Sequence, residues 1–255
     1  MSSQRALTQL HFSLETSVLR TCPSCGLSYT KGAPDDESLH RAHCIRVQRG
    51  MEWGREEHKE VEKANVEEVG RNVVLGDGTK GRIICFRADV GGKIGSKFAV
   101  LLETINLTLS SPPLTPEVLK ASKAYLFLSR SKGSPSREKI AGCVIAQRIS
   151  TAMEVASPES SSKPLSDLIP VDPSTSLFVH PEKLPTPMGI PRLFVPTTHR
   201  RLGIATRLLS VAARTFVRGC PLDPTKGEIA FTQPTGAGAG VMRAWGKGAA
   251  RIYEE

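Results

Sequence analysis

The residues that most constrain the fold of this chain are the cysteines and histidines of segment 21–44, TCPSCGLSYTKGAPDDESLHRAHC. Cys22 and Cys25 are separated by two residues, a spacing at which both thiolates can reach one metal ion. His40 follows after fourteen further residues and Cys44 four positions later, so both side chains emerge on one face of a helix. Four such ligands, with no open coordination position, predict a structural zinc site that holds a small finger together.

His43 is an alternative fourth ligand. We favour Cys44, because it leaves the usual three residues between the last two ligands, whereas His43 leaves two. The helix that would carry these ligands begins with the acidic segment DDE, and negative charge there disfavours the approach of phosphates. We therefore expect the finger to dock on a protein or to brace the adjoining domain, and we do not expect direct sequence-specific DNA binding.

A second constraint is the turn between the apolar strand 191–196 and the helix-forming segment 206–217. The turn contains Arg200, Arg201 and Gly203. Backbone N–H groups at a helix start attract a pyrophosphate, a glycine lets the backbone approach it closely, and arginines add long-range attraction. The strand, the Arg-x-x-Gly-x-Ala turn and the helix resemble the coenzyme A motif of the GNAT acetyltransferase superfamily. An ordinary surface turn with two arginines is the alternative.

The remaining hydrophobic pattern predicts a mixed α/β domain. Strand-like apolar runs occupy residues 81–90, 124–129, 140–148 and 228–232, and helical patterns occupy 97–109 and 240–245. The second and third of these strands should pair antiparallel across a loop rich in Gly, Pro and Ser. We expect a flexible arm at 1–20, the zinc finger at 21–50, a solvated connector at 51–80 and a GNAT-like domain at 81–255, with a flexible loop at about 151–187.

Several segments, in chain order, resemble the sister-chromatid cohesion N-acetyltransferases, which join a zinc finger to a GNAT-type domain. They are CGLSYT and DDESLH in the finger, AYLFLS, AGCVIA and GIPRLFV in the strands, and HRRLGIATRLL and EIAFTQPTGAG further on. The resemblance covers residues 22–255 with gaps at the loops. It implies an α/β fold, a GNAT-like mixed sheet flanked by helices, with a small N-terminal zinc finger. It also implies structural zinc, acetyl-CoA as co-substrate, and transfer of acetyl to a lysine of a cohesin ATPase-head subunit, at chromatin in the nucleus, during DNA replication.

The resemblance further implies which residues contact acetyl-CoA. They lie on the strand before the turn, in the turn itself, and before the last helix: Leu193, Phe194, Val195, Arg200, Arg201, Leu202, Gly203, Ile204, Ala205, Thr206, Thr235 and Gly236.

The catalytic residues depart from the family pattern. A lysine with an ordinary pKa of about 10.4 must lose a proton before it attacks a thioester, so a base or a water chain is needed. Family members of the animal type carry Ser and Asp at the positions of Pro191 and Gln233, and neither residue of this chain can act as a base. We take Glu228 as the leading substitute, and Gln233 as a residue that orients the substrate amine by hydrogen bonding.

The net charge, the distribution of apolar residues and one short motif indicate which partners to expect. The net charge of +9 favours chromatin, nucleic acid or acidic proteins over a neutral small metabolite. Residues 1–20 lack the apolar run of a signal peptide, and no segment approaches the ~20 apolar residues of a membrane span, so we expect an intracellular protein without a membrane partner. Residues 9–12, QLHF, partly resemble the start of sliding-clamp-binding peptides, which makes the replication sliding clamp a hypothetical partner of an arm that could equally be unstructured.

Two other functions compete with cohesin acetylation. The first is a GNAT enzyme with another protein substrate. The second is a catalytically silent zinc-finger module that binds chromatin factors, an alternative kept open by Pro191 and Gln233.

Overall fold

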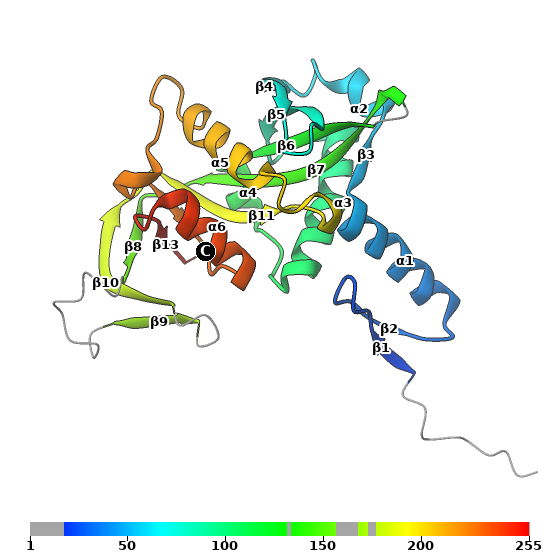
Figure 1. Ribbon diagram of the computed structural model, residues 1–255, viewed down its shortest axis with the longest axis horizontal. Helices are drawn as coiled ribbons and strands as arrows, with labels where there is room; N and C mark the ends of the chain where they lie inside the picture. The colour runs from blue at the N-terminus through cyan, green and yellow to red at the C-terminus, as the bar shows by residue number, and fades with distance from the viewer. Residues whose placement is uncertain (1–17, 132–133, 157–167, 173–176, 255) are drawn as a thin grey trace, which may run out of the picture.

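A computed structural model of the chain describes residues 18–131, 134–156, 168–172 and 177–254. Within these residues eleven strands form one mixed sheet with helices on both faces (Figure 1). The confirmed fold class is therefore a GNAT-like α/β sheet beside a small finger. No helix in the described ranges is both long and apolar enough to cross a membrane.

The strands run across the sheet in an order that differs from their order in the chain. From one edge to the other they are β4 (Glu67–Val74), β5 (Lys80–Arg87), β6 (Ser122–Ser131), β7 (Ser134–Arg148), β11 (Met188–Phe194), β12 (Ile229–Phe231), β13 (Arg251–Ile252), β8 (Thr151–Val155), β10 (Leu177–Pro185) and β9 (Ile169–Asp172). A short strand, β3 (Met51–Trp53), also pairs with β7. The β11–β12 and β12–β13 pairs are parallel, and the other pairs are antiparallel.

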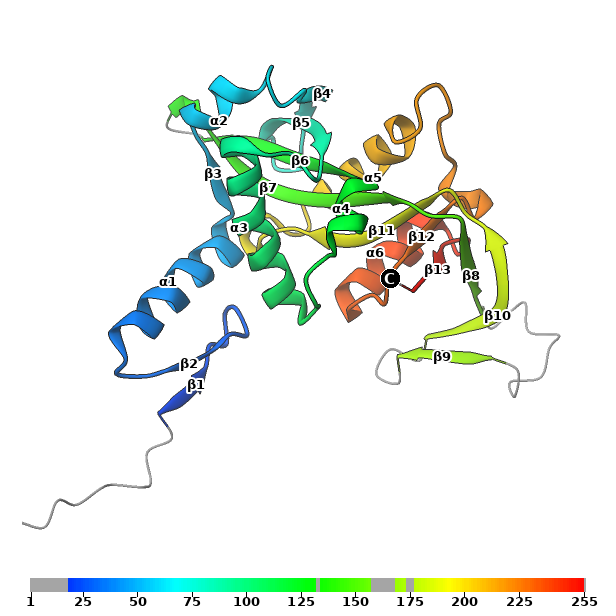
Figure 2. The same ribbon diagram turned by 180° about the vertical axis from the view of Figure 1, so that it is seen from behind.

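The helices lie in two groups, one on each face of the sheet (Figures 1 and 2). One face carries α2 (Arg55–Glu60), α3 (Gly92–Leu109) and α4 (Pro116–Lys120), and the other carries α5 (Ile204–Thr215) and α6 (Gly236–Gly246). Two short 3₁₀ turns, η2 (Thr197–His199) and η3 (Pro224–Lys226), precede α5 and β12. The finger consists of β1 (Leu19–Thr21), β2 (Ser28–Thr30) and α1 (Pro34–Arg49), and it extends from one end of the sheet (Figure 1).

The core has two layers because the central strands are covered on both faces. Along β6, Tyr125 and Phe127 pack with the α5 side, whereas Leu126 and Leu128 pack with the α3 side. Alternate residues of a strand point to opposite faces, so a strand covered twice needs apolar side chains throughout. This explains the unbroken apolar runs AYLFLS and AGCVIA, whose predicted antiparallel pairing is confirmed as β6 and β7.

Two segments are more regular than the sequence predicts. The expected connector 51–80 contains β3, α2 and β4, and the expected loop 151–187 contains β8, β9 and β10. In the first case β4 is an edge strand whose charged side chains remain exposed, so it lacks the apolar run of a buried strand. In the second case the strands are separated by residues rich in Ser and Pro, which conceal them; residues 157–167 and 173–176 of that segment lie outside the described ranges.

Helix α5 is held against the sheet at a glycine. A Cβ atom on Gly142 of β7 would lie 2.5 Å from Cγ2 of Ile204 and 2.9 Å from Cδ1 of Leu208. Both residues are buried, and Ile204 is the first residue of α5. The absence of a side chain at position 142 thus sets how closely the start of α5 approaches the sheet.

This contact predicts a specific loss of stability. Gly142→Ala should lower the free energy of unfolding by about 1–3 kcal/mol, because the added methyl group overpacks the contact with Ile204. Urea denaturation measures the change. Gly76→Ala is the matched control, since a Cβ there meets no atom within 4 Å, and it should change stability by less than about 0.5 kcal/mol. Equal effects of the two substitutions would show that the close approach at position 142 is not a constraint.

Candidate functional site

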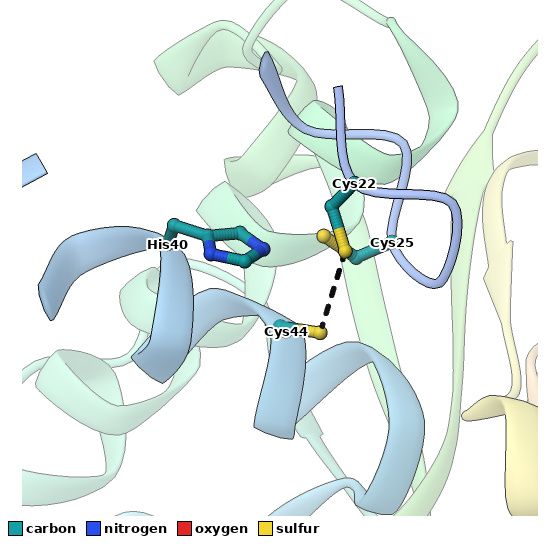
Figure 3. A group of neighbouring side chains, drawn as sticks. All are labelled: Cys22, Cys25, His40 and Cys44. Atoms are coloured by element: carbon teal, nitrogen blue, oxygen red, sulfur yellow. Dashed lines mark hydrogen bonds between the residues drawn. The ribbon is translucent and has the colours of Figure 1, made fainter. Parts of the chain in front are cut away.

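The four predicted zinc ligands lie together between the β1–β2 turn and α1 (Figure 3). Cys22 and Cys25 come from the turn after β1, and His40 and Cys44 face them from successive turns of α1. Their ligand atoms all lie within 4.8 Å of one another, and the Sγ atoms of Cys22 and Cys44 are 3.9 Å apart. Two sulfur atoms bound to one tetrahedral zinc ion at ~2.3 Å would be roughly 3.8 Å apart, so this arrangement fits zinc.

The surroundings of His40 suit a metal ligand. Its ring stacks on Tyr29 with 4.0 Å between centroids and an interplanar angle of 2°. Nε2 of His40 is buried and has no hydrogen-bond partner within the described part of the chain. A buried ring nitrogen without a partner is costly, and a metal ion would satisfy it.

The three thiols also favour a cation among them. Against the opposing effect of burial, the proximity of the His40 ring and of the Ser24 and Cys25 backbone amides lowers the pKa of Cys22 to about 6. Burial raises the pKa of Cys25 to about 11, and burial together with the nearby Cys22 raises the pKa of Cys44. One thiolate therefore forms readily while the others resist, and a divalent cation would stabilise all three.

His43, the alternative ligand, lies outside this group. It is buried, one helical turn before the buried Val47, and neither ring nitrogen has a hydrogen-bond partner among the described residues. Burial, with the positive charge of Arg46 nearby, lowers the pKa of His43, so its neutral form is favoured. The geometry brings Cys44, not His43, to the other three ligands.

Helix α1 links the finger to the large domain. Arg46 Nε donates to Thr104 Oγ1 of α3 at 2.8 Å, and Thr198 Oγ1 of η2 donates to the Gln48 carbonyl at 2.7 Å. Gln48 Nε2 in turn donates to Cys44 Sγ at 3.3 Å. Two hydrogen bonds, both made by Gln48, therefore connect the predicted zinc ligand Cys44 to η2, the segment that leads into α5.

The turn before α5 contains residues with positive φ, as the glycine in its sequence predicts. Arg201 and Gly203 both adopt left-handed conformations, with φ of 64° and 82°, and α5 begins at Ile204. No side chain caps this helix start, and its first turn contains no acidic residue. The first N–H groups of α5 therefore remain available for an anion, with the exposed Arg200 and Arg201 beside them.

Strands β11 and β12 separate next to this turn. Their parallel pairing ends at Ile190↔Phe231, while β11 continues along β7 as far as Phe194↔Cys143. Pro191 stands within the irregularity between Gly189 and Arg192, where its missing N–H costs no ladder bond. The Pro191 carbonyl still accepts from Thr232 Oγ1 at 3.1 Å, and beyond this link the two strands diverge.

Two adjoining cavities open at this divergence. The smaller, of about 70 Å³, lies between the diverging strands and the start of α6, and Leu193 lines it. The larger, of about 510 Å³, extends from there towards β8, β9, β10 and β13. Both are lined by the same group of residues, Leu109, Ser111, Thr232, Gln233, Pro234 and Thr235. The cavities therefore meet at the carboxyl end of β12.

The predicted cofactor residues fall into three groups: two line the cavities, one is buried away from them, and most of the others lie around the turn before α5. Leu193 and Thr235 line the cavities, and Thr235 Oγ1 caps α6, which begins at Gly236, by accepting from Gly238 N at 3.3 Å. Phe194 is buried on the α3 side of the sheet, so only its backbone could face a cofactor. The turn residues Arg200, Arg201, Leu202, Gly203, Ile204, Ala205 and Thr206 surround the start of α5, and the Val195 carbonyl accepts from Arg200 Nε at 3.2 Å.

The two predicted catalytic residues lie at opposite ends of β12. Gln233 lines both cavities. Glu228 precedes the strand, lines neither cavity, and accepts a hydrogen bond from the Asp223 backbone N–H at 2.6 Å. The structure therefore does not bring Glu228 to the place where the strands diverge.

Arg192 is a site residue that the sequence-based reasoning missed. It is 3% exposed, and it donates to Asn106 Oδ1 at 3.0 Å and to the Pro112 carbonyl at 2.7 Å. These bonds tie β11 to α3 and to the segment that follows it, and Arg192 and Pro112 both line the larger cavity. An arginine inside the apolar run IPRLFV was the available signal.

Substitution of single ligands should separate Cys44 from His43 as the fourth zinc ligand. We expect Cys44→Ser to weaken zinc binding by at least ~100-fold, because loss of even an outer-shell partner costs about 10–100-fold. His43→Gln and Cys220→Ser, which changes an exposed thiol far along the chain, should retain wild-type affinity. Competition with a chromophoric chelator measures the affinity. The reverse result, with His43 essential and Cys44 dispensable, would identify His43 as the ligand.

Comparisons with known proteins place both parts of the chain. Residues 9–46 match the family described as the zinc-finger of acetyl-transferase ESCO, and residues 184–253 match the family described as ESCO1/2 acetyl-transferase. N-acetyltransferase ECO1 of Yarrowia lipolytica is 26% identical over 251 residues, which cover 98% of this chain and 76% of the relative. N-acetyltransferase ESCO2 of Mus musculus is 29% identical over 217 residues, 84% of this chain but 31% of the relative. The chain therefore spans about a third of the length of such longer relatives.

Solved structures agree with the sheet described above. The xEco2 acetyltransferase domain superposes with a TM-score of 0.53 at 26% identity, over 69% of this chain and 91% of that domain. The same domain bound to a CoA conjugate gives a TM-score of 0.57 at 24% identity, which shows a shared fold. The comparisons thus confirm the resemblance found in the sequence: residues 9–46 match the zinc finger, and residues 184–253 the acetyltransferase domain, of the ESCO N-acetyltransferases, in that order.

Proposed function

We propose that this protein transfers the acetyl group of acetyl-CoA to a lysine on the ATPase head of a cohesin subunit, and so establishes sister-chromatid cohesion during DNA replication. The observation that carries the proposal is the divergence of β11 from β12 beside the uncapped start of α5. The acetyltransferase class comes from the family domains. The cohesin substrate and a nuclear location come from the resemblance of the sequence to the sister-chromatid cohesion N-acetyltransferases.

The residues at the divergence fit coenzyme A. The first N–H groups of α5, with Arg200 and Arg201, would hold the pyrophosphate, because a helix start and two guanidinium groups complement its charge. The β11 backbone from Pro191 to Val195 would lie along the pantetheine arm, with the Leu193 side chain lining the smaller cavity. The thioester end would then lie near Gln233 and Thr235, where the two cavities meet. Bound there, the co-substrate supplies the activated acetyl group.

The larger cavity suits the acceptor. It adjoins the smaller cavity at Gln233 and Thr235 and extends from there towards β8, β9 and β10, so a lysine could approach the thioester from that direction. Gln233 has an amide oxygen and an amide nitrogen with which to orient the amine.

A labelled transfer assay tests the function. Zinc-loaded protein is incubated with labelled acetyl-CoA and a purified cohesin head complex, and we expect label on lysines of the head. Label on other proteins of a nuclear extract but not on the head would point to another protein substrate. No label anywhere, with intact acetyl-CoA binding, would point to a silent chromatin-binding module.

The residues that would contact the sliding clamp lie outside the described ranges. Binding of residues 9–12 to the replication clamp therefore stays a prediction from the sequence. Titration of labelled clamp with the full chain, and with a chain in which Gln9 and Phe12 are both replaced by Ala, would test it.

The proposed pyrophosphate site predicts how one substitution changes the affinity for acetyl-CoA. Gly203→Glu should weaken acetyl-CoA binding at least ~10-fold, because it puts a carboxylate at the anion site and a side chain at a φ of 82°. Calorimetry on zinc-loaded protein measures the affinity.

Gly219→Glu is the matched control for this substitution. Gly219 also has a positive φ, of 76°, with no atom within 4 Å of an added Cβ, but it follows the other end of α5. It introduces the same charge and the same backbone strain, and it should leave the affinity unchanged. Equal affinities of the two variants would remove the turn from the cofactor site.

A further inference from the structure

Glu254 contributes a carboxylate to the larger cavity. Among the described residues that line this cavity, it is the only Asp or Glu. The side chain is exposed and lies beyond β13, close to the end of the described residues. The sequence-based reasoning did not consider it, because it looked for a base at positions 191, 228 and 233.

The strand register places Glu254 beside Gln233. In the parallel β12–β13 pair, Ala230 is opposite Arg251 and Phe231 is opposite Ile252. The Tyr253 N–H continues the ladder by donating to the Phe231 carbonyl at 3.0 Å. Continued two residues beyond Phe231 and Ile252, the same register would bring Glu254 alongside Gln233, at the strand spacing of ~4.8 Å. Both residues line the same cavity.

We propose that the Glu254 carboxylate is the general base that removes the proton from the acceptor lysine. The inference rests on the proposed acetyl transfer and deepens it. The amide of Gln233 cannot take a proton from an amine, whereas Glu254 presents a carboxylate to the same cavity. The base would thus come from the segment that directly follows β13.

The segment that carries Glu254 is anchored from the sheet. The Tyr253 hydroxyl donates to Gln147 Oε1 of β7 at 3.1 Å, and its ring lies over Gly189 of β11. A Cβ on Gly189 would be 2.6 Å from the ring, so the ring fills the space that the glycine leaves. These contacts fix the backbone directly before Glu254, as positioning a base requires.

The cavity wall can guide the lysine stem to this base. The same cavity is also lined by the apolar residues Met153, Ile169, Pro170, Val171 and Val179. Lysine buries its methylene groups along apolar surfaces and keeps its amine in polar surroundings. The amine would then reach the polar end of the cavity, at Thr232, Gln233 and Glu254.

Acetyl transfer removes two protons from the lysine ammonium. Glu254 takes one proton from the lysine ammonium, and the neutral Nζ attacks the thioester carbonyl carbon. The C–N bond forms and the C–S bond breaks, and the second proton lost from Nζ goes to the leaving thiolate to give the free thiol of coenzyme A. Glu254 returns its proton to solvent through the exposed side of the cavity.

The test compares Glu254→Gln with the wild type, in acetyl transfer to the cohesin head and to a mixed pool of lysine peptides. At neutral pH we expect kcat to fall roughly 10²–10⁴-fold, the range that general base catalysis supplies. The residual rate should rise about tenfold per pH unit up to the ordinary lysine pKa of ~10.4, because solution then removes the proton. Acetyl-CoA affinity should not change. Glu254→Asp should recover part of the rate at neutral pH.

Matched variants keep the outcomes distinct. Glu182→Gln makes the same change at an exposed position of β10 that does not line the cavity, and it should behave as the wild type. An unchanged rate for Glu254→Gln, or a loss with the wild-type pH profile, overturns the assignment. A tenfold or greater loss in Glu228→Gln without one in Glu254→Gln transfers the role to Glu228. A wild type that acetylates neither the head nor the peptides instead refutes the proposed function itself.

Discussion

The divergence of β11 from β12 is the feature on which the rest of the site depends. Parallel strands normally remain paired along their length, and here the pairing stops at Ile190↔Phe231. Pro191 cannot donate to a neighbouring strand, and the register between β11 and β7 shifts around it, between Gly189 and Arg192, while β11 stays paired with β7. One local interruption therefore ends the β11–β12 pairing where the two cavities meet, and this is the place where we propose that coenzyme A binds. Pro191 thus has a structural role at the divergence.

The finger belongs to the same architecture. Helix α1 carries the predicted metal ligands His40 and Cys44 and ends against η2, where Thr198 bonds to Gln48. The turn that would hold the pyrophosphate follows directly after η2. A metal ion that orders α1 therefore also supports the entrance to α5, which gives the finger a reason to be fused to this domain independent of nucleic acid.

Much of this arrangement could be predicted from residue chemistry. Ligand spacing identified Cys22, Cys25, His40 and Cys44, and apolar runs identified the doubly covered strands β6 and β7. The glycine turn before α5 was also evident, because few other residues adopt a φ of 82°. The edge strand β4 and the strands β8 to β10 were not evident, since partial exposure leaves no apolar run. The neighbours of Gln233 could not be found either, because the proximity of positions 233 and 254 depends on pairing between strands that are far apart in sequence.

The contact between Gly189 and Tyr253 has an evolutionary consequence. The aromatic ring occupies the volume that any side chain at position 189 would need. A larger residue at 189 is then acceptable only together with a smaller one at 253. Across homologues these two positions should covary, and lineages that keep the glycine should also keep the ring.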